Sequence, residues 1–299
     1  MISVIIVSWN TRELTLRCLQ SVCRHFQGEF EIILVDNASS DDTLAAVKEQ
    51  FPLVKIIAND RNRGYAQANN QAIRRVRGDL VLLLNSDCQI TTAGSDQELA
   101  RYFSVHPECG VVGALLFLPN GDLQTDKRVF NTAARVFLTQ ICFFDALRNK
   151  KPPSSSEAYE TDYVDGAFLC ARKELFQQVG LLDESFFMYA EDMEWCARVK
   201  ARGWAIRVLP TLAVVHHHAQ SAKKDYCRML LHNAVNNCRF IRLTQGRGAA
   251  HLAYAFYLGG MLIRVFLSVV RRNGLARDYW CGFRTTFANW KHLHARFNW

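Results

Sequence analysis

Apolar residues repeat in a strand-then-helix rhythm along the first third of the chain. Four continuous apolar or β-branched runs have the length of strands that are buried on both faces: 2–8, 30–36, 53–58 and 80–84. Amphipathic spacing from Leu14 to Val22 predicts a helix after the first run, and further helices are expected after Asn37–Thr43 and over 65–77. The pattern predicts an α/β fold in which helices cover both faces of a mostly parallel sheet.

The pattern changes beyond residue 221. Before that point we expect the following elements: apolar strands at 113–118, 164–170 and 207–215, a turn at Pro119–Asp122, a loop at 150–156, and a helix from Glu191 to a stop at Gly203. After it, a helix is expected over Tyr226–Leu243, followed by an apolar stretch over 249–270. We therefore expect two domains, a sheet domain at 1–221 and a helical region at 222–299.

Charge separates the same two regions. The 299 residues carry a formal net charge of +8. Lys223–Trp299 holds 13 Lys and Arg against two acids, a net of +11, which leaves −3 of the total +8 for the preceding 222 residues. A basic, apolar region favours an anionic partner, either a membrane surface or a nucleic acid. The first residues have a strand pattern and not that of a secretory signal, so we expect the ten cysteines to be reduced thiols of a cytoplasmic protein.

The apolar stretch at 249–270 has two interpretations. Arg264 interrupts it, so it lacks the roughly 20 uninterrupted apolar residues of a helix that spans a bilayer. An amphipathic helix lying on the inner face of the plasma membrane fits it, with Arg264, Arg271, Arg272 and Arg277 at the lipid phosphates. Packing against the sheet domain or a second subunit, as in a homodimer, stays open. The aromatic residues of this region accompany no known nucleic-acid motif, so we predict no nucleic-acid partner.

Polar residues follow three of the predicted strands, at Ser8–Asn10, Asp36–Asp41 and Asn85–Asp87. Ligands of parallel α/β sheets bind at the carboxyl ends of the strands, and these residue types suit a phosphorylated ligand. The chain has neither GxGxxG after the first strand nor GxxxxGK[ST], which argues against a dinucleotide-binding dehydrogenase and a P-loop NTPase. A metal on Asp87 is one way to hold phosphates, and an Asx turn is the structural alternative.

Two further groups of residues are candidates for chemistry. Glu191 and Asp192 stand at a predicted helix N-terminus, where a carboxylate is kept ionised and can act as a base or serve only as a cap. Three histidines follow the last strand, and in extended chain His216 and His218 share a side, so either is a candidate metal ligand. Gly166 after Asp165 indicates a close backbone approach or an ordinary bulge.

Taken together, these residues resemble the family 2 glycosyltransferases of GT-A fold, particularly the rhamnosyltransferase-like members that build bacterial surface polysaccharides. The resemblance runs from Val4 to about Ser221 and rests on seven segments in the family's order: Val7–Asn10, Val35–Asp41, Asn62–Asn70, Leu84–Asp87, Asp165–Ala167, Phe187–Asp192, and His216 with Ser221.

The resemblance implies a role for each residue. Asp192 corresponds to the catalytic base, with Glu191 orienting the site or contacting the acceptor. Asp87 corresponds to the last acid of the family's DXD motif and implies Mg²⁺ or Mn²⁺, with His216 completing the metal site. The residues implied to bind the nucleotide sugar are Ser8, Asn10, Asp36, Arg63, Gly64, Asn70, Asn85, Ser86, Asp165 and Gly166.

Three departures qualify the resemblance. Asn85 replaces the first acid of DXD, Ala219 stands where relatives often have Gly, and no QxxRW motif follows the predicted helix, which disfavours a processive polymerase. The expected function is therefore an inverting, metal-dependent transfer of a sugar from dTDP-rhamnose or a UDP-hexose to a saccharide or lipid-linked saccharide. The alternatives are a catalytically silent sugar-nucleotide-binding or assembly protein, and a nucleic-acid binder that uses the basic tail.

Overall fold

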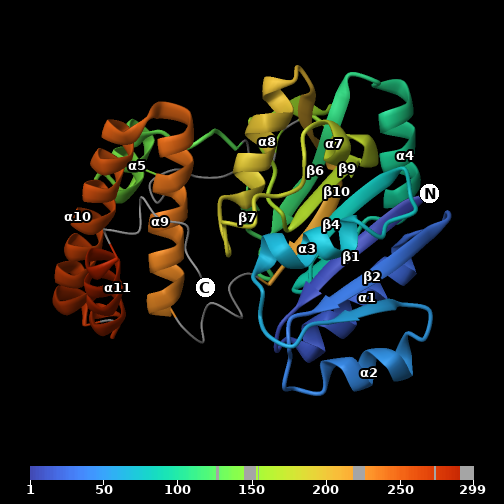
Figure 1. Cartoon of the computed structure of the whole chain (residues 1–299), viewed down its shortest axis with the longest axis horizontal. Helices are drawn as coiled ribbons and strands as arrows, with labels where there is room; N and C mark the ends of the chain where they lie inside the picture. Colours follow the sequence, from blue (N-terminus) through green and yellow to red (C-terminus); the bar gives the residue numbers. More distant parts are fainter. Residues whose placement is uncertain (126–127, 145–152, 154, 218–225, 273, 290–299) are drawn as a thin grey trace. The chain divides into compact units, whose positions relative to one another are not determined.

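The computed structural model describes the chain except for residues 126–127, 145–152, 154, 218–225, 273 and 290–299 (Figure 1). The expectations for His218, Ala219 and Ser221, and most of the loop expected at 150–156, lie outside the described residues. The chain forms two compact units. The sheet unit comprises Met1–Val129, Lys150–Glu184 and Glu191–Ser221, and the helical unit comprises Phe130–Asn149, Ser185–Ala190 and Ala222–Trp299.

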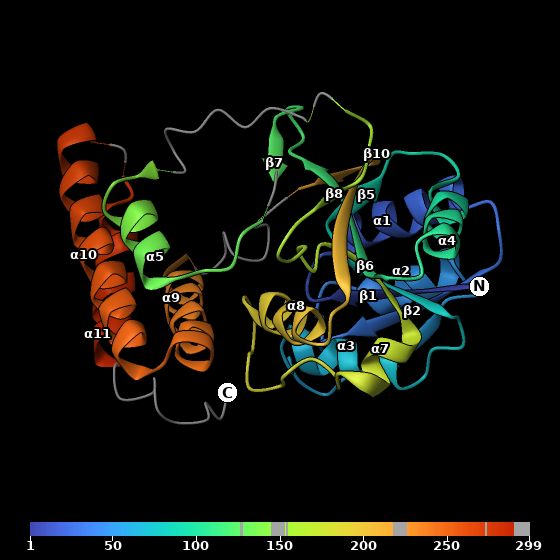
Figure 2. The same cartoon turned by 90° about the horizontal axis from the view of Figure 1, so that it is seen from above.

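The sheet unit is built on a ten-stranded sheet whose main path runs in the order β3-β2-β1-β4-β9-β6-β10-β5, with β7 beside β6 and β8 beside β10. Its strands are β1 (Ile2–Ser8), β2 (Phe30–Asp36), β3 (Lys55–Ala58), β4 (Leu80–Asn85), β5 (Cys88–Ile90), β6 (Cys109–Phe117), β7 (Leu123–Thr125), β8 (Tyr159–Glu160), β9 (Phe168–Arg172) and β10 (Ala205–His216). Neighbours β3, β2, β1 and β4 are parallel, as are β6 and β10, which lie side by side in Figure 2. The sheet is therefore mostly parallel, as the sequence predicts, with β9 reversed between β4 and β6.

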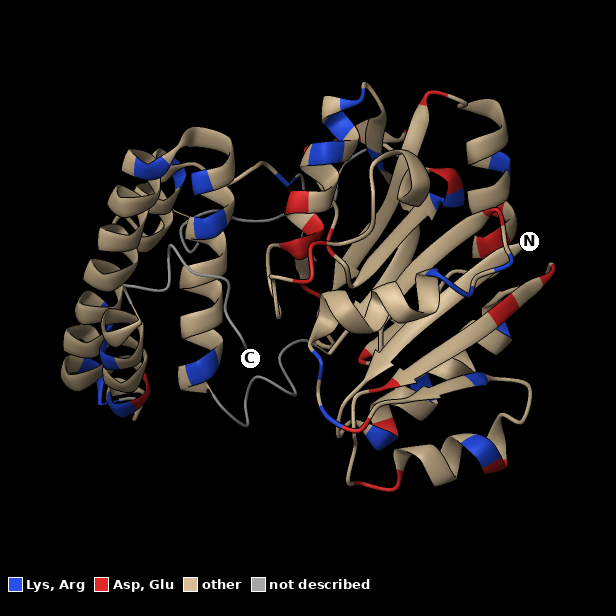
Figure 3. Ribbon diagram, in the orientation of Figure 1, with Lys and Arg blue, Asp and Glu red and all other residues tan. Residues whose placement is uncertain are grey.

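The helices of the sheet unit are α1 (Arg12–His25), α2 (Thr43–Gln50), α3 (Tyr65–Ile73), α4 (Ser95–Val105), α7 (Lys173–Gln178) and α8 (Glu191–Ala201). They shield the central strands, so Val4, Ile5 and Ile6 of β1 are completely buried. The expected helix at 191–203 is confirmed, and Gly203 ends it with a φ of +84°. Acids occupy its first turn and bases its last, the arrangement that the helix dipole favours (Figure 3).

Strand register brings the polar strand ends to one edge of the sheet. Ser8 pairs with Asp36 across β1 and β2, and Val7 pairs with Asn85 across β1 and β4. Because β9 is antiparallel, its first residues lie at the same edge, where Leu84 pairs with Phe168. His216 ends β10 opposite Cys88 of β5. The carboxyl edge of the parallel strands therefore carries most of the residues for which the sequence predicts chemistry.

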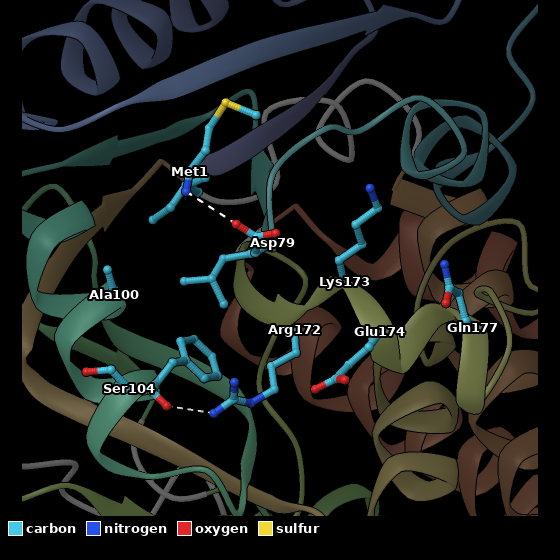
Figure 4. Close-up of a pocket in the computed structure, with 11 residues that line it drawn as sticks. Met1, Asp79, Ala100, Ser104, Arg172, Lys173, Glu174 and Gln177 are labelled. Carbon is cyan, nitrogen blue, oxygen red and sulfur yellow. Dashed lines mark hydrogen bonds and ion pairs between the residues drawn. The ribbon is translucent and has the colours of Figure 1, made fainter.

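The opposite edge of the sheet has a surface pocket of about 650 Å³ between Met1, Asp79, Phe103 and Arg172 (Figure 4). Three of its charged groups, those of Met1, Asp79 and Arg172, have partners. The Met1 amino group lies 3.6 Å from an Asp79 oxygen, and the Arg172 guanidinium donates to the carbonyls of Phe103, His106 and Cys109. We assign no chemistry to this pocket, because the arginine's hydrogen bonds hold the fold together.

The helical unit contains α5 (Ala133–Gln140), α9 (Tyr226–Gln245), α10 (Arg247–Arg271) and α11 (Ala276–Ala288). Tyr254 of α10 is completely buried and donates its hydroxyl hydrogen to the carbonyl oxygen of Thr286 in α11. A disulfide joins Cys227 of α9 to Cys281 of α11, so the prediction that all ten cysteines are reduced is wrong for this pair. The other eight cysteines are free.

The apolar stretch expected at 249–270 forms a helix, α10. Its 25 residues from Arg247 to Arg271 are continuous through Arg264, the residue that interrupts the apolar run. Within the described residues it is the one helix long and apolar enough to cross a membrane, although a third of its most apolar window, 33%, is buried within the protein.

Candidate active site

At one corner of the carboxyl edge, side-chain oxygen and nitrogen atoms that can donate electron pairs lie close together. Nε2 of His216 lies 3.2 Å from Oδ1 of Asp87, and both side chains are largely buried. Nδ1 of His216 lies 3.0 Å from Oε1 of Gln124 in β7. The potential ligand atoms of Asp87, Cys88 and His216 all lie within 4.8 Å of one another. The strand pairing of β5 with β10 therefore brings together two residues that are 129 positions apart in the sequence.

The chemistry of this corner fits a divalent cation. Oε1 of Gln124 accepts the hydrogen on Nδ1 of His216, so a neutral imidazole presents the lone pair of Nε2 toward the Asp87 carboxylate. Two electron-pair donors at this distance require a proton or a cation between them. A carboxylate with one imidazole is a donor set that suits Mg²⁺ or Mn²⁺. Burial raises the pKa of the Cys88 thiol well above its usual value, so we do not count its sulfur as a ligand.

A second corner holds the Asp192 carboxylate. Its Oδ2 accepts a 2.8 Å hydrogen bond from the backbone N–H of Gly166, and Oδ1 accepts one of 2.8 Å from the N–H of Met193. The carbonyl of Gly166 accepts a 2.6 Å hydrogen bond from the Tyr65 hydroxyl. A Cβ on residue 166 would lie 2.7 Å from that hydroxyl oxygen, which explains why glycine occupies the position. Of the two interpretations that the sequence left open for Gly166, the structure shows the close backbone approach.

Burial and neighbouring charges set the protonation of this corner. Burial, followed by the nearby Asp165 carboxylate, raises the pKa of Asp192 to about 6, against the lowering effect of the two N–H donors and of Arg128. Burial and the charge of Asp192 raise the pKa of Glu191 well above its usual value. When the two carboxyl groups share a single proton, that proton therefore resides on Glu191. Asp192 is then the ionised carboxylate that can accept a proton from a substrate.

An ion pair lies behind the Asp192 carboxylate. Arg128 donates to Oδ2 of Asp165 from Nε at 3.1 Å and from Nη2 at 2.6 Å. Asp165 lies next to Gly166, whose N–H binds Asp192. The ion pair therefore places opposite charges beside the candidate base and also anchors the backbone that binds it. The sequence predicts Asp165 as a nucleotide-sugar ligand, whereas in the structure its carboxylate binds Arg128.

A third corner joins the loops after β1 and β2. Oδ1 of Asn10 accepts hydrogen bonds from the N–H of Ser40 at 2.7 Å and from its hydroxyl at 3.2 Å. Oδ2 of Asp36 accepts one of 2.9 Å from the N–H of Ser39, while Oδ1 is buried and has no hydrogen-bond partner among the described residues. A buried carboxylate oxygen without a partner is costly, so this atom is a candidate acceptor for a ligand's donor group.

The remaining predicted ligands divide into two groups. Nε of Arg63 is buried without a partner among the described residues, while Nη2 binds Asp60 at 2.9 Å, so Arg63 retains a free donor. Asn70 has none. Both its amide hydrogens are used, on the Leu182 carbonyl at 2.8 Å and on the Glu184 carboxylate at 3.0 Å, so we leave Asn70 out of the proposed site.

Three other predicted residues line the carboxyl edge. Ser8 is completely buried, and its hydroxyl lies 3.2 Å from that of Thr11 and 2.9 Å from that of Thr15. The Thr11 hydroxyl in turn lies 3.1 Å from that of Ser86. These hydroxyl contacts link the loop after β1 to the loop after β4 and stabilise both. Gly64 has a φ of +78° and begins α3, and its carbonyl accepts from the amide of Asn37.

Sequence reasoning did not single out Arg128, Tyr65, Gln124 or Thr11. Tyr65 lies inside the segment Asn62–Asn70 that supports the resemblance, so that segment was the available signal for it. Arg128 and Gln124 stand in no recognisable pattern, and only the strand pairing and the chain path after β7 bring them to the site.

Solved structures similar to this chain include glycosyltransferases of GT-A fold. A mannosyltransferase of Pyrobaculum calidifontis, solved with GDP-Man and Mn²⁺, aligns over 96% of this chain and 84% of its own, with a TM-score of 0.59 and 17% identity. GalNAc-T7, solved with UDP, GalNAc and Mn²⁺, aligns over 72% of this chain and 43% of its own, with a TM-score of 0.58 and 19% identity. The chain thus has the fold of the GT-A glycosyltransferases.

Within that class, the chain belongs to glycosyl transferase family 2, whose family model matches residues 3–179. It is 28% identical over 228 residues to the N-acetylglucosaminyl-diphospho-decaprenol L-rhamnosyltransferase of Mycobacterium tuberculosis, a match that covers 70% of this chain and 73% of that protein. It is also 28% identical over 204 residues to the O-antigen biosynthesis protein RfbC of Myxococcus xanthus, covering 66% of this chain and 16% of that protein. The predicted family is confirmed, and these relatives support sugar transfer in polysaccharide synthesis.

Proposed function

We propose that this glycosyltransferase inverts the transferred sugar, with Asp192 as its catalytic base. The observation that carries the proposal is the state of Asp192, which two backbone N–H groups hold in place while its pKa is raised to about 6. A base of that pKa is ionised at neutral pH and basic enough to accept the proton of an attacking hydroxyl.

The reaction then proceeds as a single displacement. Asp192 removes the proton from an acceptor hydroxyl as that oxygen forms a bond to the anomeric carbon. The bond from the anomeric carbon to the nucleoside diphosphate breaks on the opposite face, so the configuration inverts. Glu191 remains protonated behind the base, because burial and the neighbouring carboxylate disfavour its ionised form.

The proposed donor site lies along the loops after β1, β2 and β4. The unpartnered Oδ1 of Asp36 would accept a hydrogen bond from the base or ribose, and the free Nε of Arg63 would donate to a phosphate oxygen. Asn85 and Ser86 would border the donor near the metal corner. Asp87 and His216 would hold Mg²⁺ or Mn²⁺, whose charge stabilises the departing diphosphate.

The relatives suggest which substrates to test. One is a rhamnosyltransferase that acts on an N-acetylglucosaminyl-diphospho-lipid, so we propose dTDP-rhamnose, or else a UDP-hexose, as donor and a lipid-linked saccharide as acceptor. A panel of nucleotide sugars with Mn²⁺ should reveal the donor by thermal shift, since a donor at about 100 times its dissociation constant stabilises the fold by about 2.7 kcal/mol.

The panel's best donor is then incubated with a short-chain N-acetylglucosaminyl-diphospho-lipid, and the glycosylated product is sought by mass spectrometry. Binding without transfer or donor hydrolysis would favour a catalytically silent binder. Loss of all turnover on chelation of the metal, with recovery on adding Mn²⁺, would establish the metal requirement.

The helical unit is proposed to hold the enzyme at the cytoplasmic face of the membrane. Three apolar side chains at the C-terminal end of α10 are exposed, with Phe266 at 67%, Val269 at 61% and Val270 at 62%. Arg271 and Arg272 follow directly, a pattern that suits acyl chains beside lipid phosphates. Flotation with anionic liposomes should carry the protein upward at low salt and less so at high salt. Failure to float, together with a dimeric mass in solution, would assign the face to a second subunit.

A further inference from the structure

The six residues before the carboxylate pair, Ser185–Ala190, belong to the helical unit, and the chain passes from them directly into Glu191. The last two, Tyr189 and Ala190, have φ values of +72° and +68°. Left-handed backbone is unfavourable for residues that carry a Cβ, and two in succession persist only when surrounding contacts enforce them. Something in the structure must therefore hold this turn.

Helix α9 supplies the contacts. Nδ2 of Asn236 donates a 2.8 Å hydrogen bond to the carbonyl of Met188, immediately before the turn. Nη1 of Arg239 donates one of 2.8 Å to the carbonyl of Ser185, where the segment begins. Side chains of α9 thus hold the main chain of the segment at its first residue and immediately before the left-handed turn.

Aromatic contacts add to these bonds. The Phe187 ring stacks on the His232 imidazole with centroids 5.2 Å apart, and the Arg239 guanidinium lies 5.1 Å from the centroid of the Phe186 ring. His232, Asn236 and Arg239 are spaced by four and three residues, so they share one face of α9.

This face is made of polar side chains in a buried place. His232 and Asn236 are each 1% exposed. Buried polar groups are unfavourable unless they have partners. Asn236 donates to the Met188 carbonyl, and His232 stacks on the Phe187 ring while its Nε2 accepts a 3.3 Å hydrogen bond from Nε of Arg228. This polar face of α9 is therefore complementary to the segment 185–190. Without that segment, its polar side chains would be unfavourable inside a helical bundle.

We propose that His232, Asn236 and Arg239 form a positioning surface for the turn at Tyr189–Ala190, and that this surface fixes the backbone that leads directly into Glu191 and Asp192. The inference rests on the proposed role of Asp192 as the base. The backbone N–H of Gly166 holds the Asp192 carboxylate through its Oδ2, while the α9 face holds the segment that precedes it. The helical unit then contributes to catalysis as well as to any membrane binding.

The principal test compares Asn236→Ala with Asn237→Ala. Asn237 is the neighbouring residue of α9, is also buried at 6% exposure, and bonds to Asn131 and to the Asn233 carbonyl, away from 185–190. Asn236→Ala should lower kcat for transfer at least tenfold and leave the dissociation constant of the donor with Mn²⁺ within about twofold of the wild type. Asn237→Ala should match its loss of thermal stability and keep kcat within about threefold of the wild type.

A rescue separates positioning from general destabilisation. Glycine adopts positive φ without strain, so Ala190→Gly added to Asn236→Ala should restore at least a third of the lost kcat. Should Asn236→Ala fail to fold, Arg239→Gln serves in its place, because it removes the bond to Ser185 and keeps a long helix-compatible side chain. Equal loss of kcat in the Asn236 and Asn237 variants, or no recovery with Ala190→Gly, would overturn the proposal.

Hydrogen exchange gives a readout that does not depend on activity. The peptide spanning Ser185–Met193 should exchange at least tenfold faster in Asn236→Ala than in the wild type and be unchanged in Asn237→Ala. If the wild-type protein transfers no sugar, the proposed function fails, and the exchange comparison still decides whether α9 holds the turn. Unchanged exchange in Asn236→Ala would refute the positioning surface even in an active enzyme.

Discussion

Replacing Arg128 by Gln tests the electrostatic description of the candidate base. The side chain binds Asp165 at 2.6 Å, and its positive charge lowers the pKa of Asp192 while the charge of Asp165 raises it. Gln removes the cation and leaves the Asp165 carboxylate without its ion-pair partner. Both changes act in the same direction, so the pKa of Asp192 should rise, by about one unit for one lost opposite charge in a partly buried site.

The sign of the effect on rate follows from the role of a base. Asp192 acts when ionised, so kcat/KM should rise with pH and level off above the pKa of about 6. A shift of about one unit lowers the ionised fraction at pH 6 from about one half to about one tenth. Arg128→Gln should therefore lose about fivefold of kcat/KM near pH 6 and less than about twofold above pH 8.

The assay measures kcat/KM for the acceptor at saturating donor and fixed Mn²⁺, from about pH 5 to about pH 9 at constant ionic strength. Lys55→Gln is the matched control, since Lys55 pairs with the Glu31 carboxylate at the same distance of 2.6 Å on β3 and plays no part in the site. An unshifted profile for Arg128→Gln, or one moved toward lower pH, would refute this description of Asp192.

Three further changes test the other parts of the site. Asp192→Asn should leave donor affinity nearly unchanged and lower turnover by roughly 10² to 10⁴, which single-turnover kinetics and a donor titration would measure; near wild-type turnover would remove it from the role of base. Asp87→Asn and His216→Ala should each raise the Mn²⁺ concentration needed for half-maximal activity at least tenfold, and an unaltered metal titration would place the cation elsewhere. Gly166→Ala forces a Cβ to within 2.7 Å of the Tyr65 hydroxyl oxygen and should lower kcat about tenfold or more, with partial recovery when Tyr65→Phe is added; full activity of the single variant would contradict the tight packing.

The sequence predicted β1, β2 and β4 well because these strands are buried on both faces, whereas the short strands β5, β7 and β8 were not predicted. The runs at 2–8 and 30–36 coincide with β1 and β2, whose apolar character does not depend on distant residues. The expected strand at 207–215 is a single strand, β10, with a bulge between Leu209 and Ala213 that accommodates Pro210. Helices α4, α5, α7 and α11 were not predicted, and their apolar residues are interspersed with polar ones.

The candidate site was predictable where motifs carry it and unpredictable where only tertiary contacts do. Asp87 and His216 meet as the resemblance implies. The pairing of Arg128 with Asp165, and the engagement of Asn70 by Leu182, depend on chain paths that no local pattern encodes. The left-handed turn at Tyr189–Ala190 contains no glycine, which is the residue that would have marked it.

The reversal of β9 has a consequence for how the enzyme can be modified. Since this strand begins at the carboxyl edge, its far end at Arg172 and the short helix α7 that follows lie at the opposite edge of the sheet. Epitopes, fluorophores or surface-attachment groups introduced near the exposed Gln177 would therefore lie at the edge of the sheet opposite the candidate active site. Enzyme immobilised through this edge would leave the carboxyl edge accessible to bulky lipid substrates.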